Sequence, residues 1–250
     1  MGETVRGVPI ESSQLRDIGV SAALASHMTG HGWMTRLSRG VYMLTGDEPT
    51  REGVLVFLCQ RVPGLHVGGA SALRWAALRY DDAAHLDLWS PKTCEFPDWV
   101  PLHVPFSFQT TSVFDPDDAY SAGLTEHRAR GGCIVVAEPE RALCEMASDV
   151  GKSLSLEEAT RIAAASPELR PATLLGLLKR ITRTKVRRLV CEITRKADLA
   201  CAPEIAAFLS DVDTGRRWSM LTRTGQRLTL SPQRTRNAFQ QGLNPCKEMP

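Results

Sequence analysis

A run of cations near the C-terminus is the densest group of side chains with a definite chemistry. Its members are Lys179, Arg180, Arg183, Lys185, Arg187 and Arg188. Each phosphate that such side chains neutralise releases counterions, so the run could supply affinity for a polyanion. An apolar stripe from Val186 to Ile193 predicts a helix over 184–196 with its charges on the opposite, solvent-facing side. The run is therefore interpreted as a basic face for nucleic acid or an acidic protein surface, with a merely solvated helix face as the alternative.

A second group of residues could form a metal-dependent nucleotidyltransferase site. Such a site follows a Gly-Ser turn with two carboxylates at positions i and i+2 of a strand, because both then reach the same metal ions. Here Gly68-Gly-Ala-Ser71 precedes His85-Leu-Asp87, so a histidine stands where the first carboxylate is required. One aspartate cannot hold two magnesium ions. We therefore expect a protein that is not an enzyme and that has no catalytic residue, bound metal or cofactor.

Two further pairs of residues have simple structural interpretations. Arg141 and Glu145 are four residues apart on a predicted helix that begins at Pro139, so they are expected to form a local ion pair. His27 and His31 have the same spacing, but glycines beside them end the helix, so a structural or exposed role is predicted rather than metal binding.

The elements that could position contacts to nucleic acid lie between Val8 and Leu44. Two short helices are predicted on either side of a turn at Gly19, the first capped by Ser12 or Ser13 and the second by Ser21. Strand-forming residues follow over 33–37 and 41–44, with Ser38-Arg39-Gly40 as the turn between them. Helix, turn, helix and a two-stranded wing together describe a winged helix-turn-helix, whose second helix enters the DNA major groove.

Periodicity selects the residues of this unit that would contact DNA. The spacing of Ile18, Val20, Leu24 and Met28 predicts a buried face, which leaves small residues, including Ala22 and Ala25, facing outward. Small side chains let a helix backbone approach the bases closely, and cations on a wing reach phosphates. The predicted DNA-binding residues are Ser21, Ser26, Thr29, Arg36 and Arg39. The alternative is a small helical hairpin that packs against the rest of the chain.

Several segments of this region resemble the AbiEi family of bacterial antitoxins. They include Ser12-Ser-Gln-Leu, Gly19-Val-Ser and Gly32-Trp-Met-Thr-Arg-Leu-Ser-Arg-Gly-Val-Tyr. Later segments, such as Glu138-Pro-Glu-Arg-Ala-Leu-Cys-Glu and Thr184-Lys-Val-Arg-Arg-Leu, extend the resemblance in order to about Pro232. A winged helix usually has another helix before Val8, so either a strand takes its place or the start is truncated.

The resemblance implies the antitoxin of a bacterial type IV toxin–antitoxin system. Such an antitoxin neutralises a partner nucleotidyltransferase toxin, functionally and with or without direct contact, and represses its own operon by binding inverted repeats in double-stranded DNA. Inverted repeats require two copies, so a protein that is monomeric in solution would pair cooperatively on DNA. The basic run would then serve DNA or the toxin. The alternatives are a stand-alone transcriptional regulator with a ligand-sensing C-terminal domain and a nucleotidyltransferase-like enzyme.

Composition indicates a globular protein of the cytoplasm. The 250 residues are 43% hydrophobic and 23% charged, with no apolar run long enough to span a membrane and no N-terminal signal sequence. Seven scattered cysteines, none in a Cys-x-x-Cys pair, are typical of reduced thiols. No membrane partner is expected.

The charge is distributed unevenly along the predicted domains. Residues 1–50 have a net charge of −1, residues 51–178 of −6 and residues 179–250 of +9. The break at Gly46-Asp-Glu-Pro-Thr50 predicts a winged helix-turn-helix domain over 1–49 and a larger domain over 50–250, with a loose tail over 231–250. In the larger domain, strands, including one over 102–108, precede helices, and a hairpin around Thr224-Gly225 comes last. This order predicts an α+β fold.

Overall fold

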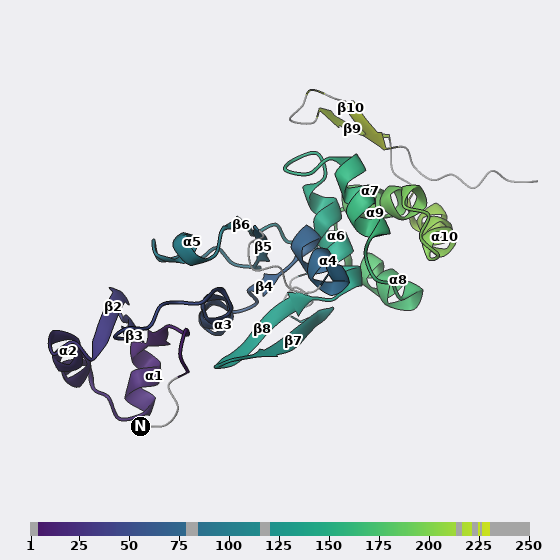
Figure 1. The fold of residues 1–250 in the computed structure, drawn as a ribbon. Coiled ribbons are helices and arrows are strands. Elements are labelled where there is room, and N and C mark those ends of the chain that lie inside the picture. The colour runs from purple at the N-terminus through teal and green to yellow at the C-terminus, as the bar shows by residue number, and fades with distance from the viewer. Residues whose placement is uncertain are drawn as a thin grey trace, which may run out of the picture.

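The computed structural model describes residues 5–78, 85–115, 121–213, 217–221, 225 and 227–230. The molecule is elongated, with a small N-terminal domain at one end and a larger body of sheet and helices at the other (Figure 1). This arrangement confirms the predicted α+β class.

The N-terminal domain is the predicted winged helix-turn-helix. It consists of β1 (Ile10–Glu11), α1 (Ser12–Asp17), α2 (Ala22–Gly30), β2 (Met34–Ser38) and β3 (Val41–Leu44). The three strands form an antiparallel sheet in the order β1-β3-β2. A strand, β1, thus precedes the first helix and joins the sheet of the wing.

Local sequence signals fix the two short helices. The Ser21 side chain accepts a hydrogen bond from the Leu24 N–H at 3.2 Å, as predicted for the cap of α2. Gly19 has a φ of +85°, which lets the chain reverse between the helices. The prediction for α1 was wrong in detail, because Glu11 is the cap: it forms a capping box with Gln14, whose Oε1 accepts the Glu11 N–H at 2.8 Å.

A five-stranded mixed sheet forms the middle of the body. Its strands, in spatial order, are β6 (Phe106–Gln109), β5 (Leu86–Trp89), β4 (His66–Val67), β8 (Gly132–Ala137) and β7 (Leu124–Ala129). The pairs β4–β8 and β5–β6 are parallel, whereas β4–β5 and β7–β8 are antiparallel. The parallel neighbours are joined by connections that contain helices.

The predicted strand over 102–108 was wrong at its start. Residues Val100–His103 form the short helix α5, because Pro101 lies in its first turn, where a missing N–H costs nothing. Pro105 precedes β6 rather than interrupting it, so the strand starts at Phe106.

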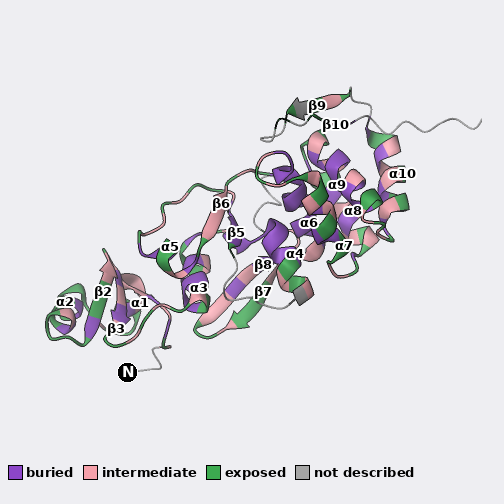
Figure 2. Ribbon diagram, turned by 45° about the horizontal axis from the view of Figure 1, so that its top comes forward, coloured by how far each residue is buried: buried purple, intermediate pink, exposed green. Residues whose placement is uncertain are grey.

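Helices surround the buried helix α6 (Pro139–Asp149), in which every residue from Glu140 to Asp149 is buried (Figure 2). The other elements of the body are α3 (Arg51–Arg61), α4 (Gly69–Leu78), α7 (Leu156–Ala164), α8 (Pro171–Arg180), α9 (Thr184–Lys196), α10 (Ala202–Val212), β9 (Trp218–Leu221) and β10 (Arg227–Leu230). Helices α4, α7, α8 and α9 all contact α6. Helix α10 was not predicted, although Pro203 and the apolar pair Ile205 and Leu209 mark it.

Two hydrophobic cores correspond to the two parts of the molecule. Leu15, Ala25, Met28 and Met34 form the small core of the N-terminal domain. The large core includes buried residues from Val41 to Leu230, and the half-buried Leu37 of β2 packs against it, so two residues of the wing pack with the body. The boundary between residues 49 and 50 stays a prediction, and the predicted tail and Thr224 lie outside the described residues. None of the helices that the structure describes is both long and apolar enough to cross a membrane.

Candidate nucleic-acid interface

Helix α2 lies at the free end of the N-terminal domain (Figures 1 and 2). Its inner face contributes Ala25, 2% exposed, and Met28, 8% exposed, to the small core. The prediction was therefore right for Met28 but wrong for Ala25, which was expected to face outward. It was also wrong for Leu24, 43% exposed, and Ile18, 56% exposed, which were expected to be buried. A short helix packs closely on its neighbour through a small residue, and Ala25 provides it.

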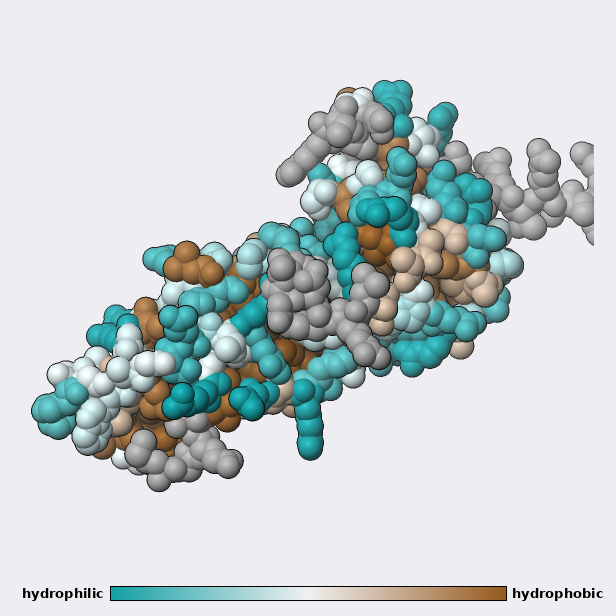
Figure 3. All heavy atoms as spheres, viewed as in Figure 1, coloured by the Kyte–Doolittle hydropathy of each residue, from teal (hydrophilic) through white to brown (hydrophobic). Residues whose placement is uncertain are grey.

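Six residues of α2 are exposed, and four of them, Ala23, Ser26, His27 and Gly30, form its solvent face, flanked by Ala22 and Leu24. These four share one side because successive residues of a helix are rotated by about 100°. Figure 3 shows mainly pale spheres of intermediate hydropathy over this end of the molecule. The sequence predicted Ser26 and the flanking Ala22 correctly as exposed, and it did not select Ala23, His27 or Gly30.

Two predicted contact residues already use their hydroxyl groups within the helix. Ser21 is exposed, but its oxygen caps α2. Thr29 is half-buried and donates from Oγ1 to the Ala25 carbonyl at 2.8 Å. Ser26 is thus the predicted hydroxyl that faces solvent without such a bond in the described part of the chain.

His27 and His31 form a stacked pair on the exposed side of α2. Their ring centroids are 3.9 Å apart and the rings are inclined by 27°. The His31 Nδ1 lies 2.9 Å from the His27 carbonyl oxygen. A carbonyl oxygen only accepts hydrogen bonds, so the proton of this bond must be on Nδ1.

The wing carries two exposed arginines and is hydrogen-bonded to α1 and to the body. Arg36 and Arg39 are exposed, and the Arg36 Nε–H donates to the Ser38 carbonyl at 3.2 Å, where the strand register shifts. The Trp99 Nε1–H donates to Ser38 Oγ at 3.3 Å, and the Ser12 N–H donates to the Gly40 carbonyl at 2.8 Å. These bonds fix the wing to both α1 and the body, so its arginines are held on a defined support.

The C-terminal run of cations does not form the continuous basic face that the sequence predicted. Lys179, Arg180 and Arg183 are exposed. Lys185 is half-buried: its Nζ donates to the Val150 carbonyl at 3.0 Å and lies 5.1 Å from the centre of the Trp218 ring. Burial lowers the pKa of Lys185, and the nearby Lys152 adds to the effect.

Arg187 and Arg188 point into the protein, which corrects the prediction for both. Arg187 donates to the Leu178 carbonyl at 3.0 Å and the Ile181 carbonyl at 2.5 Å, and so caps the C-terminal end of α8. Arg188 is 4% exposed and forms a bidentate ion pair with Asp213. Helices α8 and α9 lie at the opposite end of the molecule from α2, so the remaining exposed cations and the exposed face of α2 are separate surfaces (Figures 1 and 2).

Family models match nearly all of the described chain. The N-terminal domain model of the AbiEi antitoxin transcriptional regulators matches residues 1–81. A second model, described as a transcriptional regulator and AbiEi antitoxin of a type IV toxin–antitoxin system, matches residues 83–230. The chain belongs to the AbiEi antitoxin family. This membership confirms the resemblance noted in the sequence.

Other comparisons add little about this AbiEi protein. The crystal structure of the RV2827C protein from Mycobacterium tuberculosis is similar with a TM-score of 0.48 and 13% identity, over 81% of this chain and 75% of that chain. A search of curated proteins finds no significant match.

A buried ionic cluster in the body of the AbiEi protein contains the predicted pair of Arg141 and Glu145. Glu145 Oε1 accepts from Arg141 Nε at 2.7 Å and lies 2.9 Å from His66 Nε2, and its Oε2 accepts the Gly69 N–H at 3.1 Å. Burial alone raises the pKa of Glu145, but the charges of His66 and Arg141 outweigh burial and lower it to about 2. The hollow beside the cluster is only about 20 Å³, room for no more than one water molecule. The cluster is therefore a closed structural element.

Asp87 of the AbiEi protein has a structural role in place of the metal ligation considered from the sequence. Its Oδ2 accepts from the Ser71 N–H at 3.2 Å and the Ser71 hydroxyl at 2.9 Å, and its Oδ1 accepts from the Ser107 hydroxyl at 2.9 Å. These bonds tie the start of α4 to β5 and β6. Among the described residues, no group of three or more His, Cys, Asp or Glu side chains is arranged to hold a metal ion.

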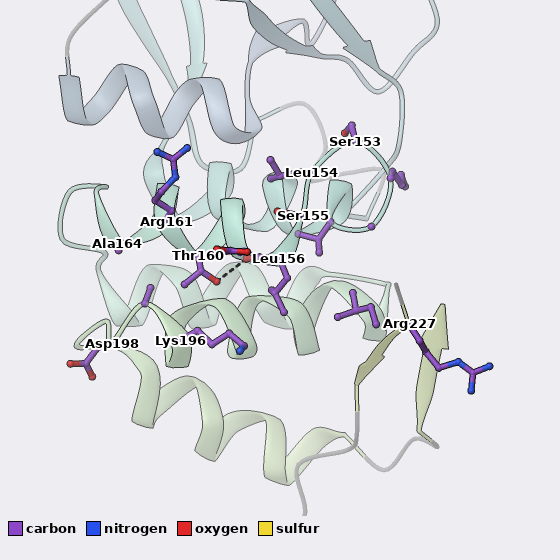
Figure 4. A pocket seen from close by; sticks show the side chains of 16 residues that line it. Ser153, Leu154, Ser155, Leu156, Thr160, Arg161, Ala164, Lys196, Asp198 and Arg227 are labelled. Carbon is purple, nitrogen blue, oxygen red and sulfur yellow. Dashed lines mark hydrogen bonds between the residues drawn. The ribbon is translucent and has the colours of Figure 1, made fainter. Parts of the chain in front are cut away.

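The AbiEi body also contains a cavity of about 970 Å³ between the loop over 150–155, α7, the end of α9 and β10 (Figure 4). Leu154, Leu156 and Leu228 contribute apolar surface to it, and Lys152 and Lys196 contribute cations. Its size lies within the range of small-molecule sites.

Proposed function

We propose that this AbiEi antitoxin represses its own operon by placing α2 in the major groove at each half of an inverted repeat. The observation that carries the proposal is the exposed face of small residues on α2, beside a wing that is braced by Trp99. Arg36 and Arg39 would contact phosphates or the minor groove next to the bases that α2 reads. Two copies would bind cooperatively, with half-sites about 10 base pairs or a multiple apart.

The charge of the N-terminal domain allows the salt dependence of DNA binding to be predicted. Residues 1–50 have a net charge of −1, so non-specific attraction to DNA is small. Each phosphate contact contributes about −0.9 to the slope of log affinity against log salt concentration. Four wing arginines from two copies would therefore contribute about −3.6 to that slope.

A gel-shift titration over the upstream region of the native operon tests this proposal. The double variant Arg36→Ala/Arg39→Ala should bind more weakly at low salt and show a shallower salt dependence. Arg128→Ala serves as the control, because Arg128 is exposed on β7 in the body. Equal, weak binding by the wild type and the wing variant would exclude the wing as a DNA contact.

We further propose that the body neutralises a nucleotidyltransferase toxin through the exposed cations at the α8–α9 junction. The predicted basic face is thereby narrowed to Lys179, Arg180 and Arg183. These side chains are far from α2, which leaves them accessible while the N-terminal domain is on DNA. An acidic patch on the toxin would be the complementary surface.

Growth rescue from the neighbouring toxin tests the second proposal. Reversing the charges with Lys179→Glu/Arg180→Glu/Arg183→Glu should abolish protection and leave repression intact. Arg36→Ala/Arg39→Ala should abolish repression and leave protection intact. Deletion of α9 is unsuitable, because Leu189, Val190 and Ile193 belong to the large core and their loss would unfold the body. Full protection by the charge-reversed protein would show that the junction does not neutralise the toxin. If the wild-type protein protects but does not co-purify with the toxin, the antagonism does not require contact.

The cavity beside α7 favours a second candidate function, a regulator whose DNA binding responds to a small anionic molecule with an apolar part. A titration with 8-anilinonaphthalene-1-sulfonate would test it, because this probe has both features. Under this candidate, one probe molecule should bind per chain, Leu156→Glu should prevent binding, and operator affinity should change when the probe is bound. Unchanged operator affinity favours the antitoxin proposal alone.

A further inference from the structure

The solvent face of α2 carries small side chains apart from His27, with the exposed Leu24 beside it. Ala23, Ser26 and Gly30 are small, so the helix backbone can lie close to the floor of a groove. Among the described residues of this face, His27 alone carries a ring that projects beyond them. A base edge opposite the middle of α2 would therefore meet His27 first.

The neighbouring His31 determines how the His27 ring is held. His31 is the C-cap residue of α2, and its Nδ1–H is bonded to the His27 carbonyl at 2.9 Å. Its ring stacks on that of His27 with the centroids 3.9 Å apart. A ring that is supported on its face presents its nitrogen atoms at its edge, and the His27 nitrogens have no hydrogen-bond partner in the described part of the chain. The arrangement holds the ring nitrogens of His27 on the outside of the helix, where they can bond to a neighbouring molecule.

We infer that His27 is a specificity-determining residue that donates a hydrogen bond to N7 of a guanine in each operator half-site, and that His31 is its positioning residue. This inference rests on the proposed binding of α2 to operator DNA. Guanine presents two acceptors, N7 and O6, in the major groove, whereas adenine presents one acceptor beside a donor amino group. An imidazole N–H is therefore compatible with the whole guanine edge and is opposed by the amino group of adenine.

The stacked pair also has a purely structural explanation, in which it only ends the helix. That role requires the bond from His31 to the backbone, but it requires nothing from the ring nitrogens of His27. The two explanations therefore differ in whether His27 changes the base preference. They can be separated by changing the base and the side chain together.

The experiment begins with selection of bound duplexes from a randomised DNA library by the full-length wild-type protein. Each guanine of the selected half-site is then replaced in turn by 7-deazaguanine, which lacks the N7 acceptor. Wild type should lose tenfold or more in affinity at one position in each half-site. His27→Ala should show a similar loss on the unmodified duplex and no further loss with 7-deazaguanine there.

Two further variants separate positioning from general weakening. His31→Ala should reduce the sensitivity to 7-deazaguanine at the same position, and His31→Phe, which keeps a ring for stacking, should restore most of it. Arg36→Ala should weaken binding to all duplexes alike without changing the base preference.

The outcomes distinguish this inference from the function on which it rests. If wild type selects no sequence, operator recognition by α2 fails and the inference fails with it. If wild type selects a sequence and His27→Ala keeps the same preference and the same sensitivity to 7-deazaguanine, the inference is overturned while operator binding stands. Both histidines are exposed, so thermal unfolding of the variants should match wild type and confirm that the fold is retained.

Discussion

Arg188 donates hydrogen bonds from Nε and Nη2 to the two carboxylate oxygens of Asp213, at 2.5 and 2.8 Å. Both side chains are buried, and the pair joins α9 to the end of α10. The Arg188 Nη1 also lies 3.4 Å from the Leu230 carbonyl, which connects the pair to β10. An arginine that the sequence places in a basic surface thus holds three C-terminal elements together.

Arg188→Ala should destabilise the protein strongly, because it leaves the buried carboxylate of Asp213 without its cation. Breaking such a pair costs about 3–5 kcal/mol of unfolding free energy. Arg183→Ala is the matched control, since Arg183 is exposed in the same segment, and it should change stability by less than about 0.5 kcal/mol. Urea unfolding gives the unfolding free energy of both variants and of the wild type. Normal stability of Arg188→Ala with reduced DNA affinity would restore the surface role for this residue.

Glu145 should make the protein sensitive to acid. Its pKa is held at about 2, below the ordinary 4.5, so its contribution to stability is complete above pH 4.5 and is lost as the pH falls toward 2. The loss over that interval is about 3 kcal/mol at 1.36 kcal/mol per pKa unit. Unfolding free energies between pH 6 and pH 2.5 should show this loss in the wild type and in Glu126→Gln, an exposed control, but Glu145→Gln should lack it. An identical pH profile for Glu145→Gln would contradict the assignment.

Asp149 should lower the stability of the protein as the pH rises, whereas Glu145 lowers it as the pH falls. Burial raises its pKa from 3.8 to about 6, and the nearby Asp87 and Glu145 contribute. A carboxyl with a raised folded-state pKa stabilises the protein while it is protonated, so its contribution is lost as the pH rises from 3.8 through 6. Asp149→Asn should therefore be more stable than wild type at pH 7, by up to about 3 kcal/mol, and equally stable near pH 3.5. Lower stability of the variant at pH 7 would show that the attraction of Lys152 outweighs burial.

The orientation of α2 can be tested with two alanines that are two residues apart. Ala25→Leu adds volume to the small core and should cost about 1–3 kcal/mol, whereas Ala23→Leu on the solvent face should cost less than about 0.5 kcal/mol. Thermal unfolding of the two variants gives the comparison directly. A reversed order would mean that the helix faces the way its apolar periodicity suggests.

Local signals explain what the sequence predicted well. The cap at Ser21, the turn at Gly19 and the prolines that open α6 and α8 act through the neighbouring backbone, so they can be recognised from adjacent residues. The face of α2 was predicted wrongly because the periodic set began with Ile18 and Val20. These residues precede the helix, so their spacing does not follow its rotation.

Contacts between distant residues explain the other errors. The partner of Arg188 is 25 residues away on another element, and the partner of Lys185 is a carbonyl 35 residues away. Neither partner can be read from the charge pattern of α9 itself. The stacked histidines were assigned a structural or exposed role because glycines beside them end the helix, and the outward positions selected by periodicity did not include His27.

The separation between α2 and the helical body has a consequence for how two bound copies are arranged. Because only the tip of each elongated molecule would touch DNA, the bodies extend beyond the half-sites, and their mutual direction depends on the phase of the double helix. Inserting about five base pairs between the half-sites, half a turn, would turn the two bodies to opposite sides of the duplex. The length of the spacer would then determine whether neighbouring copies can touch, with every base contact unchanged.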